Sequence, residues 1–314
     1  MRPVFADPKT DLIFKRIFGQ PAHKGCLIAL LNDLLELPEA RLIEDVEYLS
    51  PEQVPMVLEQ KRSIVDVKCT DRTGTTYVVE MQVLNVEGFE KRLIYNAAKA
   101  YVGQLRSGDT YPGLNDVIAV AICDFELWPD GQRPEGSPAI PLLSQFEMRE
   151  VHSGAHAFGQ LRLVVLELPK YRGGDRPATT VERWAYFFRE CERLSAIPAV
   201  LALPPFAEVL DLARISALSE AEYDRYEREL MAETDSRQAI VKADRIGAAR
   251  GRAEGRSEGR AEGAALALQD AVLKLLEHRG PVDPEVRARV ASCQDLAVLR
   301  QWLVPAATGA LPAE

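Results

Sequence analysis

The sequence has few of the residues that build structural zinc sites. Only five of its 314 residues are cysteine and four are histidine. No two cysteines form a CxxC pair, so a structural zinc site is not expected. His152 and His156 are close in sequence, but the Ser-Gly-Ala between them is typical of a turn, which argues against a shared metal. An odd number of widely spaced thiols in apolar surroundings indicates reduced cysteines, as in a cytosolic protein.

The sequence also lacks a long apolar run. No stretch approaches the roughly 20 apolar residues that a membrane-spanning helix needs. Residues 1–9 have no apolar core of the signal-peptide type, so we expect a cytoplasmic protein without membrane association. The net charge of −9 argues mildly against a nucleic-acid partner. Nucleases bind DNA through local basic patches, however, so the net charge does not decide the class of protein.

Helix and strand patterns alternate along most of the chain. Asp7 and Pro8 predict a helix N-cap followed by proline at the first helical position, and Gly19 predicts the end of that helix. A continuous apolar run at 117–123 predicts a strand buried on both faces, and the order of elements predicts an α/β core with a mixed sheet. Other helices are expected at 22–35, 89–106, 181–194, 206–215 and 220–245, and another strand at 161–168.

A β-hairpin is expected over residues 64–83. The loop Arg72-Thr73-Gly74, with glycine at the left-handed position, is a common hairpin connection and pairs Asp71 with Thr75. This register pairs Lys68 with Val78 and Asp66 with Glu80, and it separates the side chains into two faces, as a half-buried hairpin needs. The apolar face contains Val65, Val67, Cys69, Tyr77, Val79, Met81 and Val83, and the polar face contains Asp66, Lys68, Thr70, Thr76, Glu80 and Gln82.

Two carboxylates opposite each other on a hairpin repel unless a cation lies between them. The register puts the Cβ atoms of Asp66 and Glu80 about 4.5–5.5 Å apart. A hard divalent ion such as Mg²⁺ or Mn²⁺ prefers carboxylate oxygens and would balance the two charges. The alternative is that both acids are ordinary polar side chains of a strand and that Lys68 pairs with one of them. The spacing Asp-x13-Glu-x-Gln is a weak signal by itself.

Several separate motifs resemble those of one nuclease family and occur in the expected order. They are Thr10 to Gly19 (TDLIFKRIFG), Leu30 to Asn32, Asp66, Tyr77 to Gln82 (YVVEMQ), Phe89, Arg92, Tyr95, Gly108 to Tyr111, Leu166 to Lys170 (LELPK), Trp184 and the surroundings of Tyr223 to Tyr226. Over residues 7–250 the chain resembles the PD-(D/E)XK nuclease family transposases, also called Rpn or YhgA-like recombination-promoting nucleases. The resemblance implies a restriction-endonuclease-like mixed sheet flanked by helices, here with a helical C-terminal extension.

The resemblance also implies an activity, a cofactor and site residues. It implies metal-dependent hydrolysis of DNA phosphodiester bonds, with a role in recombination, mobile elements or defence against foreign DNA. Asp66, Glu80 and Gln82 match the catalytic positions, and Asp66, Glu80 and the Met81 carbonyl would hold Mg²⁺ or Mn²⁺. Asp11 matches an acidic residue on the first helix that can support a metal. The alternative for Asp11 is an i,i+4 pair with Lys15.

One position departs from the wider superfamily, which has lysine where this chain has Gln82, although this family tolerates glutamine. An amide can orient water or phosphate, but it has no positive charge and cannot act as a base. Lys68 on the same expected face could substitute, or it is a plain surface lysine. We expect Lys15, Lys68, Lys91 and Arg92 to contact DNA. The missing lysine also favours a rival interpretation: a catalytically weak or inactive DNA-binding or oligomerising regulatory protein.

A four-residue repeat distinguishes the C-terminal third of the chain. Glycine recurs at every fourth position of 247–263, with arginine and glutamate in step. This segment is poor as a lone helix because of its glycines and its like-charge neighbours, but together with the C-terminal module it could pair with a second copy to form a homodimer. The alternatives are a flexible tether or DNA contact through its arginines, Arg252, Arg256 and Arg260. We expect a nuclease domain at 1–235, the repeat at 236–263 and a small helical module at 264–314, with helices at 264–278, from Asp283 onward and at 296–303.

Overall fold

The computed structural model describes residues 3–53, 63–106, 108–132, 135–278 and 280–308. The chain forms two compact units, Met1–Thr234 and Asp235–Glu314. No helix among the described residues is long and apolar enough to cross a membrane.

The first unit is built on a six-stranded mixed sheet with the strand order β1-β4-β5-β6-β8-β7. The three central strands β5, β6 and β8 are parallel, and antiparallel strands flank them on both sides. The expected mixed α/β sheet is therefore confirmed. The strands are β1 Val46–Tyr48, β4 Val67–Asp71, β5 Thr76–Gln82, β6 Val117–Cys123, β7 Leu143–Met148 and β8 Phe158–Glu167, and a separate pair is formed by β2 Glu52–Gln53 and β3 Ser63–Ile64.

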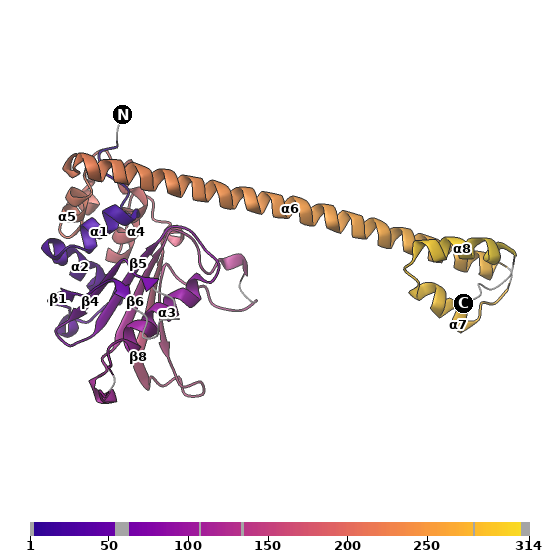
Figure 1. Ribbon diagram of the computed structural model, residues 1–314, viewed down its shortest axis with the longest axis horizontal. Coiled ribbons are helices and arrows are strands. Elements are labelled where there is room, and N and C mark those ends of the chain that lie inside the picture. The colour runs from indigo at the N-terminus through magenta and orange to yellow at the C-terminus, as the bar shows by residue number, and fades with distance from the viewer. Residues whose placement is uncertain (1–2, 54–62, 107, 133–134, 279, 309–314) are drawn as a thin grey trace. The chain divides into compact units, whose positions relative to one another are not determined.

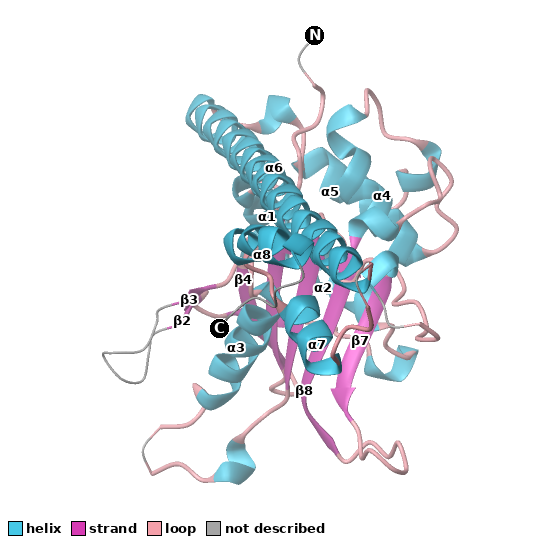
Figure 2. Ribbon diagram, turned by 90° about the vertical axis from the view of Figure 1, so that its right-hand side faces the viewer, coloured by secondary structure: helices cyan, strands magenta, loops and turns pink. Residues whose placement is uncertain are grey.

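Helices cover both faces of this sheet, because its central strands are apolar on both sides. Every residue of β6 is buried, as its unbroken apolar sequence predicts. Helix α3 lies against one face, and helices α1, α2, α4 and α5 gather on the other (Figures 1 and 2). The helices are α1 Asp11–Phe18, α2 Lys24–Leu35, α3 Phe89–Val102, α4 Thr180–Glu190, α5 Phe206–Leu212, α6 Glu220–Glu277, α7 Pro284–Ser292 and α8 Leu296–Thr308.

The hairpin of β4 and β5 has the register expected from its loop. Lys68 pairs with Val78 and Thr70 with Thr76. Gly74 has φ +89°, and an added Cβ would come within 2.7 Å of the Asn115 side chain, so both conformation and space require glycine.

The expected division of the hairpin into one buried and one solvated face is wrong. Helix α3 covers the face that carries the polar residues, and Val78 is fully buried beneath it. Val65 also packs on this side, whereas Val67 and Val79 pack on the other. The chain bends at Asp66 and β4 begins one residue later, which breaks the simple alternation of side chains.

The first helix begins later than the sequence suggests. Helix α1 starts at Asp11 with Thr10 as its N-cap, although its end at Gly19 is as expected. Asp7 instead forms a turn, because its carboxylate accepts a hydrogen bond from the Lys9 backbone N–H at 2.9 Å. The Tyr226 hydroxyl accepts a hydrogen bond from the Asp7 N–H at 2.8 Å, which fixes this turn against α6.

The second unit contains its own small apolar core, made by the end of α6 with α7 and α8. Asp283 caps α7 by accepting a hydrogen bond from the Glu285 N–H at 2.8 Å, as its sequence predicts. The helices expected separately at 220–245 and 264–278 are parts of one helix, α6, which includes the glycine repeat. A Cβ added at any glycine of the repeat would meet no atom within 4 Å.

Candidate active site

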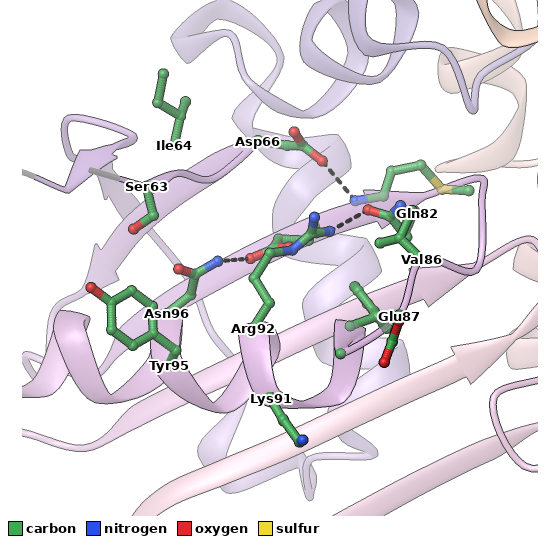
Figure 3. A pocket seen from close by; sticks show the side chains of 14 residues that line it. Ser63, Ile64, Asp66, Gln82, Val86, Glu87, Lys91, Arg92, Tyr95 and Asn96 are labelled. Carbon is green, nitrogen blue, oxygen red and sulfur yellow. Dashed lines mark hydrogen bonds and ion pairs between the residues drawn. The ribbon is translucent and has the colours of Figure 1, made fainter. Parts of the chain in front are cut away.

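A cavity of ≈ 800 Å³ opens at the end of β5 and is lined by β3, β5, the segment after β5 and the first turns of α3. Asp66 and Glu80 both line it, together with Gln82, Arg92 and Asn96 (Figure 3). The ladder of β4 and β5 ends at the pair of Val67 and Val79. The expected pair of Asp66 with Glu80 therefore does not form, but Asp66 lies directly before β4 and reaches the same cavity as Glu80.

Asp66 is a half-buried carboxylate at the bend before β4. One of its oxygens accepts a hydrogen bond from the Met81 backbone N–H at 2.7 Å. The pKa of Asp66 is raised to about 6, chiefly by burial and to a smaller extent by the charges of Asp11 and Glu80, while the hydrogen bond from Met81 and the charge of Lys15 act in the opposite direction. Among the described residues, no ammonium or guanidinium group lies within ion-pair distance of Asp66.

Glu80 is held in place from α3. Its Oε1 accepts a hydrogen bond from Asn96 Nδ2 at 2.6 Å, and its Oε2 lies 3.7 Å from an Arg92 nitrogen. Only 5% of Glu80 is exposed, and burial raises its pKa above the usual range despite Asn96 and Arg92, which act in the opposite direction. The cavity therefore contains two carboxylates whose surroundings favour the neutral form more than water does.

These donors fit a hard divalent cation. Asp66 and Glu80 supply carboxylate oxygens, and the Met81 peptide lies beside Asp66. Within the described part of the chain, no group of three or more His, Cys, Asp or Glu side chains converges as a metal site. Two carboxylates, a backbone carbonyl and water suit Mg²⁺, which usually keeps several of its waters, better than they suit zinc.

Gln82 and Arg92 form a linked pair on the cavity wall. An Arg92 guanidinium N–H donates to Gln82 Oε1, and Gln82 Nε2 donates to the Leu84 carbonyl at 2.8 Å. These two bonds fix the orientation of the Gln82 amide, with its oxygen toward Arg92. The guanidinium also lies over the Phe89 ring, 5.2 Å from its centre. A fixed positive charge therefore stands beside both Glu80 and Gln82.

The other residues expected at the site lie in three different settings. Asp11 does not line the cavity; it forms ion pairs with Lys15 at 2.5 Å and with Arg225 at 2.9 Å, which is the structural alternative considered for it. Lys68 is outside the cavity wall and has no carboxylate within ion-pair distance among the described residues, so it does not pair with either acid. Lys91 does line the cavity, as Arg92 does.

Sequence reasoning missed Asn96, Ser63 and the apolar residues at the cavity opening. A signal existed for Asn96. It is 1% exposed on the inner side of α3, in line with Phe89, Leu93 and Ala100. An asparagine within the apolar stripe of an amphipathic helix needs a polar partner, and here the partner is Glu80.

The mixed sheet, its flanking helices and the two acids, Asp66 directly before β4 and Glu80 in β5, define a restriction-endonuclease-like α/β protein. The family model for the PD-(D/E)XK nuclease family transposase matches residues 8–243, and the chain belongs to this family. The resemblance noted from the motifs is thus confirmed, and nucleases of the PD-(D/E)XK type generally use divalent metals. Searches of curated proteins and of solved structures gave no match.

Proposed function

We propose that the protein is a Mg²⁺- or Mn²⁺-dependent DNA endonuclease that hydrolyses phosphodiester bonds at the cavity at the end of β5. One observation carries the proposal: the half-buried Asp66 and the buried Glu80, both with raised pKa values, line a single cavity. Removing two carboxylates from water is costly unless a cation compensates them. If the two acids had only a structural role, nothing would offset the free-energy cost of removing them from water.

The residues of the cavity have separate tasks in this proposal. Asp66, Glu80 and the Met81 carbonyl would hold the ion, which when bound would supply charge stabilisation at the scissile phosphate and activation of water. Asn96 fixes one oxygen of Glu80 and so orients the carboxylate. Gln82 orients water or phosphate through the donor and acceptor capacity left after its bonds to Leu84 and Arg92.

A nicking assay on supercoiled plasmid with Mg²⁺, Mn²⁺, Ca²⁺ or EDTA tests the proposal. Wild-type protein should nick the plasmid with Mg²⁺ or Mn²⁺ and not with EDTA. Asp66→Asn and Glu80→Gln should abolish nicking, because each removes a charged oxygen donor. Glu227→Gln on the exposed side of α6 is a matched control that should keep full activity. Full metal-dependent nicking by pure Asp66→Asn protein would overturn the proposal.

The second candidate function is a catalytically weak or inactive DNA-binding regulator. It is favoured by Gln82, whose side chain carries no charge and already has a hydrogen-bond partner at each end. In that case calorimetry would detect Mg²⁺ or DNA binding that depends on Asp66, while the nicking assay would show no cleavage with any metal. We place the protein's action in the cytoplasm, which agrees with its free cysteines, four of which are buried.

We also propose that the chain forms a homodimer through residues 247–263, between a nuclease domain at 1–235 and a helical module at 264–314. The open glycine stripe supports close approach of a second helix. Because arginine and glutamate each recur every four positions, residues such as Arg256 and Glu258 have only like charges at i±4 within the repeat. A second chain can supply the opposite charges.

The order of residues in the repeat favours a parallel pair. Arginine follows Gly251, Gly255 and Gly259, and glutamate precedes Gly255, Gly259 and Gly263, so the two charges flank the stripe on opposite sides. In a parallel pair the arginine flank of one helix faces the glutamate flank of the other, whereas like charges meet in an antiparallel pair. In a parallel pair the two copies of position 247 lie close together. The variant Gly247→Cys should therefore form a disulfide between the two chains under oxidation. A monomer by light scattering, unchanged when residues 247–263 are deleted, would rule out the homodimer.

A further inference from the structure

The opening of the acidic cavity has an apolar rim formed by Ile64, Val86 and Tyr95. Their exposed fractions are 68%, 39% and 38%, although all three line the same cavity as Asp66 and Glu80. They come from β3, from the segment after β5 and from α3 (Figure 3). Single exposed apolar residues are ordinary, but three around one polar cavity indicate a surface for an apolar part of a ligand.

The rim is arranged before any ligand binds. Lys99 Nζ lies 5.4 Å from the centre of the Tyr95 ring and donates hydrogen bonds to the Gln53 carbonyl at 2.9 Å and to Ser63 Oγ at 3.3 Å. These contacts tie α3, which carries Tyr95, to the strand pair that carries Ile64. A preformed aromatic surface binds at a lower entropic cost than one that must be ordered by its ligand.

Cations lie next to this rim. Lys91 and Arg92 line the cavity beside Tyr95, and Lys91 has no carboxylate within ion-pair distance among the described residues. The cavity of ≈ 800 Å³ is also larger than an ion and one phosphate require. One wall thus combines positive charge, which suits phosphate, with an exposed aromatic ring, which suits the face of a nucleobase.

A continuous duplex does not use such a rim well. Its bases are stacked on each other, so it would present charged phosphates to Ile64, Val86 and Tyr95. An unpaired nucleotide exposes the face of its base, which can stack on an aromatic ring whatever the sequence.

We infer that the rim of Ile64, Val86 and Tyr95 binds an unpaired nucleobase next to the scissile phosphate. This inference rests on the proposed function and names its substrate class: DNA with a single-stranded segment, such as a gap, a flap or a free strand. The acids act on the backbone, and the rim selects DNA whose bases are not all paired.

Binding of 2-aminopurine DNA to the full chain in EDTA tests the inference without turnover. Wild-type protein should bind a single strand more tightly than the matched duplex, and stacking should quench the fluorescence of the unpaired base. Tyr95→Ala should weaken single-strand binding about 10-fold and remove the quenching, with duplex binding unchanged. Tyr95→Phe keeps the ring and should behave as wild type.

Two further variants separate rim contacts from general damage. Tyr111→Ala removes an aromatic residue that is 81% exposed and does not line the cavity, so it should change nothing. Ile64→Ser should weaken single-strand binding in the same direction as Tyr95→Ala, and melting curves identify any variant that fails to fold. Equal affinity of wild-type protein for single strand and duplex, or an equal effect of Tyr95→Ala on both, would overturn the inference.

Failure of the inference and failure of the proposed function give different results. If plasmid is nicked with Mg²⁺ and Tyr95→Ala alters neither binding nor cleavage of gapped DNA, the nuclease stands and the rim has no such role. If no metal supports cleavage but single-strand binding still depends on the Tyr95 ring, the rim stands and the nuclease does not.

Discussion

The two faces of the sheet differ in composition and in what they contribute. The face under α1, α2, α4 and α5 contains a cluster of aromatic rings, including Phe14, Phe18 and Trp184, whose centres lie 4.7 to 6.3 Å from their neighbours. The face under α3 contains smaller side chains such as Ala119 and Ala121, and its buried groups include the charged Glu80. Packing on the first face stabilises the fold. This stabilisation offsets the free-energy cost of keeping carboxylates from water on the second face.

The largest effect on the aromatic face is expected from Trp184→Ala. Trp184 is fully buried and its indole N–H donates to Asp33 at 2.7 Å. Its loss should lower the free energy of unfolding by about 3–5 kcal/mol, measured by urea denaturation. By contrast, Asn96→Ala under α3 should cost about 1–3 kcal/mol and strongly reduce nicking. If Asn96→Ala kept full activity, the division between the two faces would not hold.

On the α3 face, Arg92→Ala should reduce the nicking rate about 100-fold, because it removes the positive charge beside Glu80 and Gln82. Changing Gln82 to lysine in the same protein should recover much of that loss, since the ammonium group would restore a cation on the cavity wall. Leu84→Ala, which keeps the backbone carbonyl that Gln82 uses, serves as the control. No recovery in the Gln82→Lys, Arg92→Ala double variant would show that Arg92 does not act through its charge.

The raised pKa of Asp66 predicts how stability depends on pH in the metal-free protein. The folded state holds the Asp66 proton up to about pH 6, above the ordinary value of 3.8. The unfolded state therefore binds fewer protons in this window, and the free energy of unfolding falls as the pH rises from about 4 to about 6. Asp66→Asn has no carboxyl group at this position, so this decrease in the free energy of unfolding should be absent from the variant.

The variant should consequently match wild type near pH 4 and exceed it by up to about 3 kcal/mol at pH 8, where wild-type Asp66 is ionised. Chemical denaturation in EDTA at several pH values measures the difference. Saturating Mg²⁺ should narrow it, because the ion stabilises the ionised form. Parallel pH curves for the two proteins would contradict a raised Asp66 pKa.

The smallest expected effect is that of Thr179→Ala at the start of α4. The Thr179 hydroxyl accepts a hydrogen bond from the Glu182 N–H at 3.1 Å within a capping box. Its removal should cost about 1 kcal/mol of stability and leave nicking unchanged, since α4 lies on the aromatic face. A change in nicking rate in protein that remains folded would show that the two faces are coupled.

The sequence allowed prediction of the features that depend on local chemistry. The hairpin register follows from Asp71 and Gly74, and the buried strand β6 follows from its continuous apolar run. The edge strands β1 and β7 were not predicted, because β1 is only three residues long and β7 has no continuous apolar run. The misplaced Val65 has a similar cause: its side depends on a bend at Asp66 that no local pattern indicates.

The site was predictable in part for the same reason. Asp66 and Glu80 line one cavity because a local loop sets the register of β4 against β5 and Asp66 directly precedes the paired residues. The neighbours of Glu80 come from α3, and their contacts depend on how that helix packs on the sheet. The environment of Asp11 depends on Arg225, which is more than 200 residues away, so its ion pairs could not be chosen over a metal from sequence.

Gly74 has a consequence for how this cavity can be lost or altered. The glycine lies at the opposite end of the hairpin from Glu80, about 20 Å along β5. Any other residue there would strain the turn and collide with Asn115, and a shift of one residue would rotate Glu80 to the other side of the sheet. A substitution at this turn can therefore remove Glu80 from the cavity although it changes neither acid. A screen for inactive variants should recover changes at this turn as well as in the cavity.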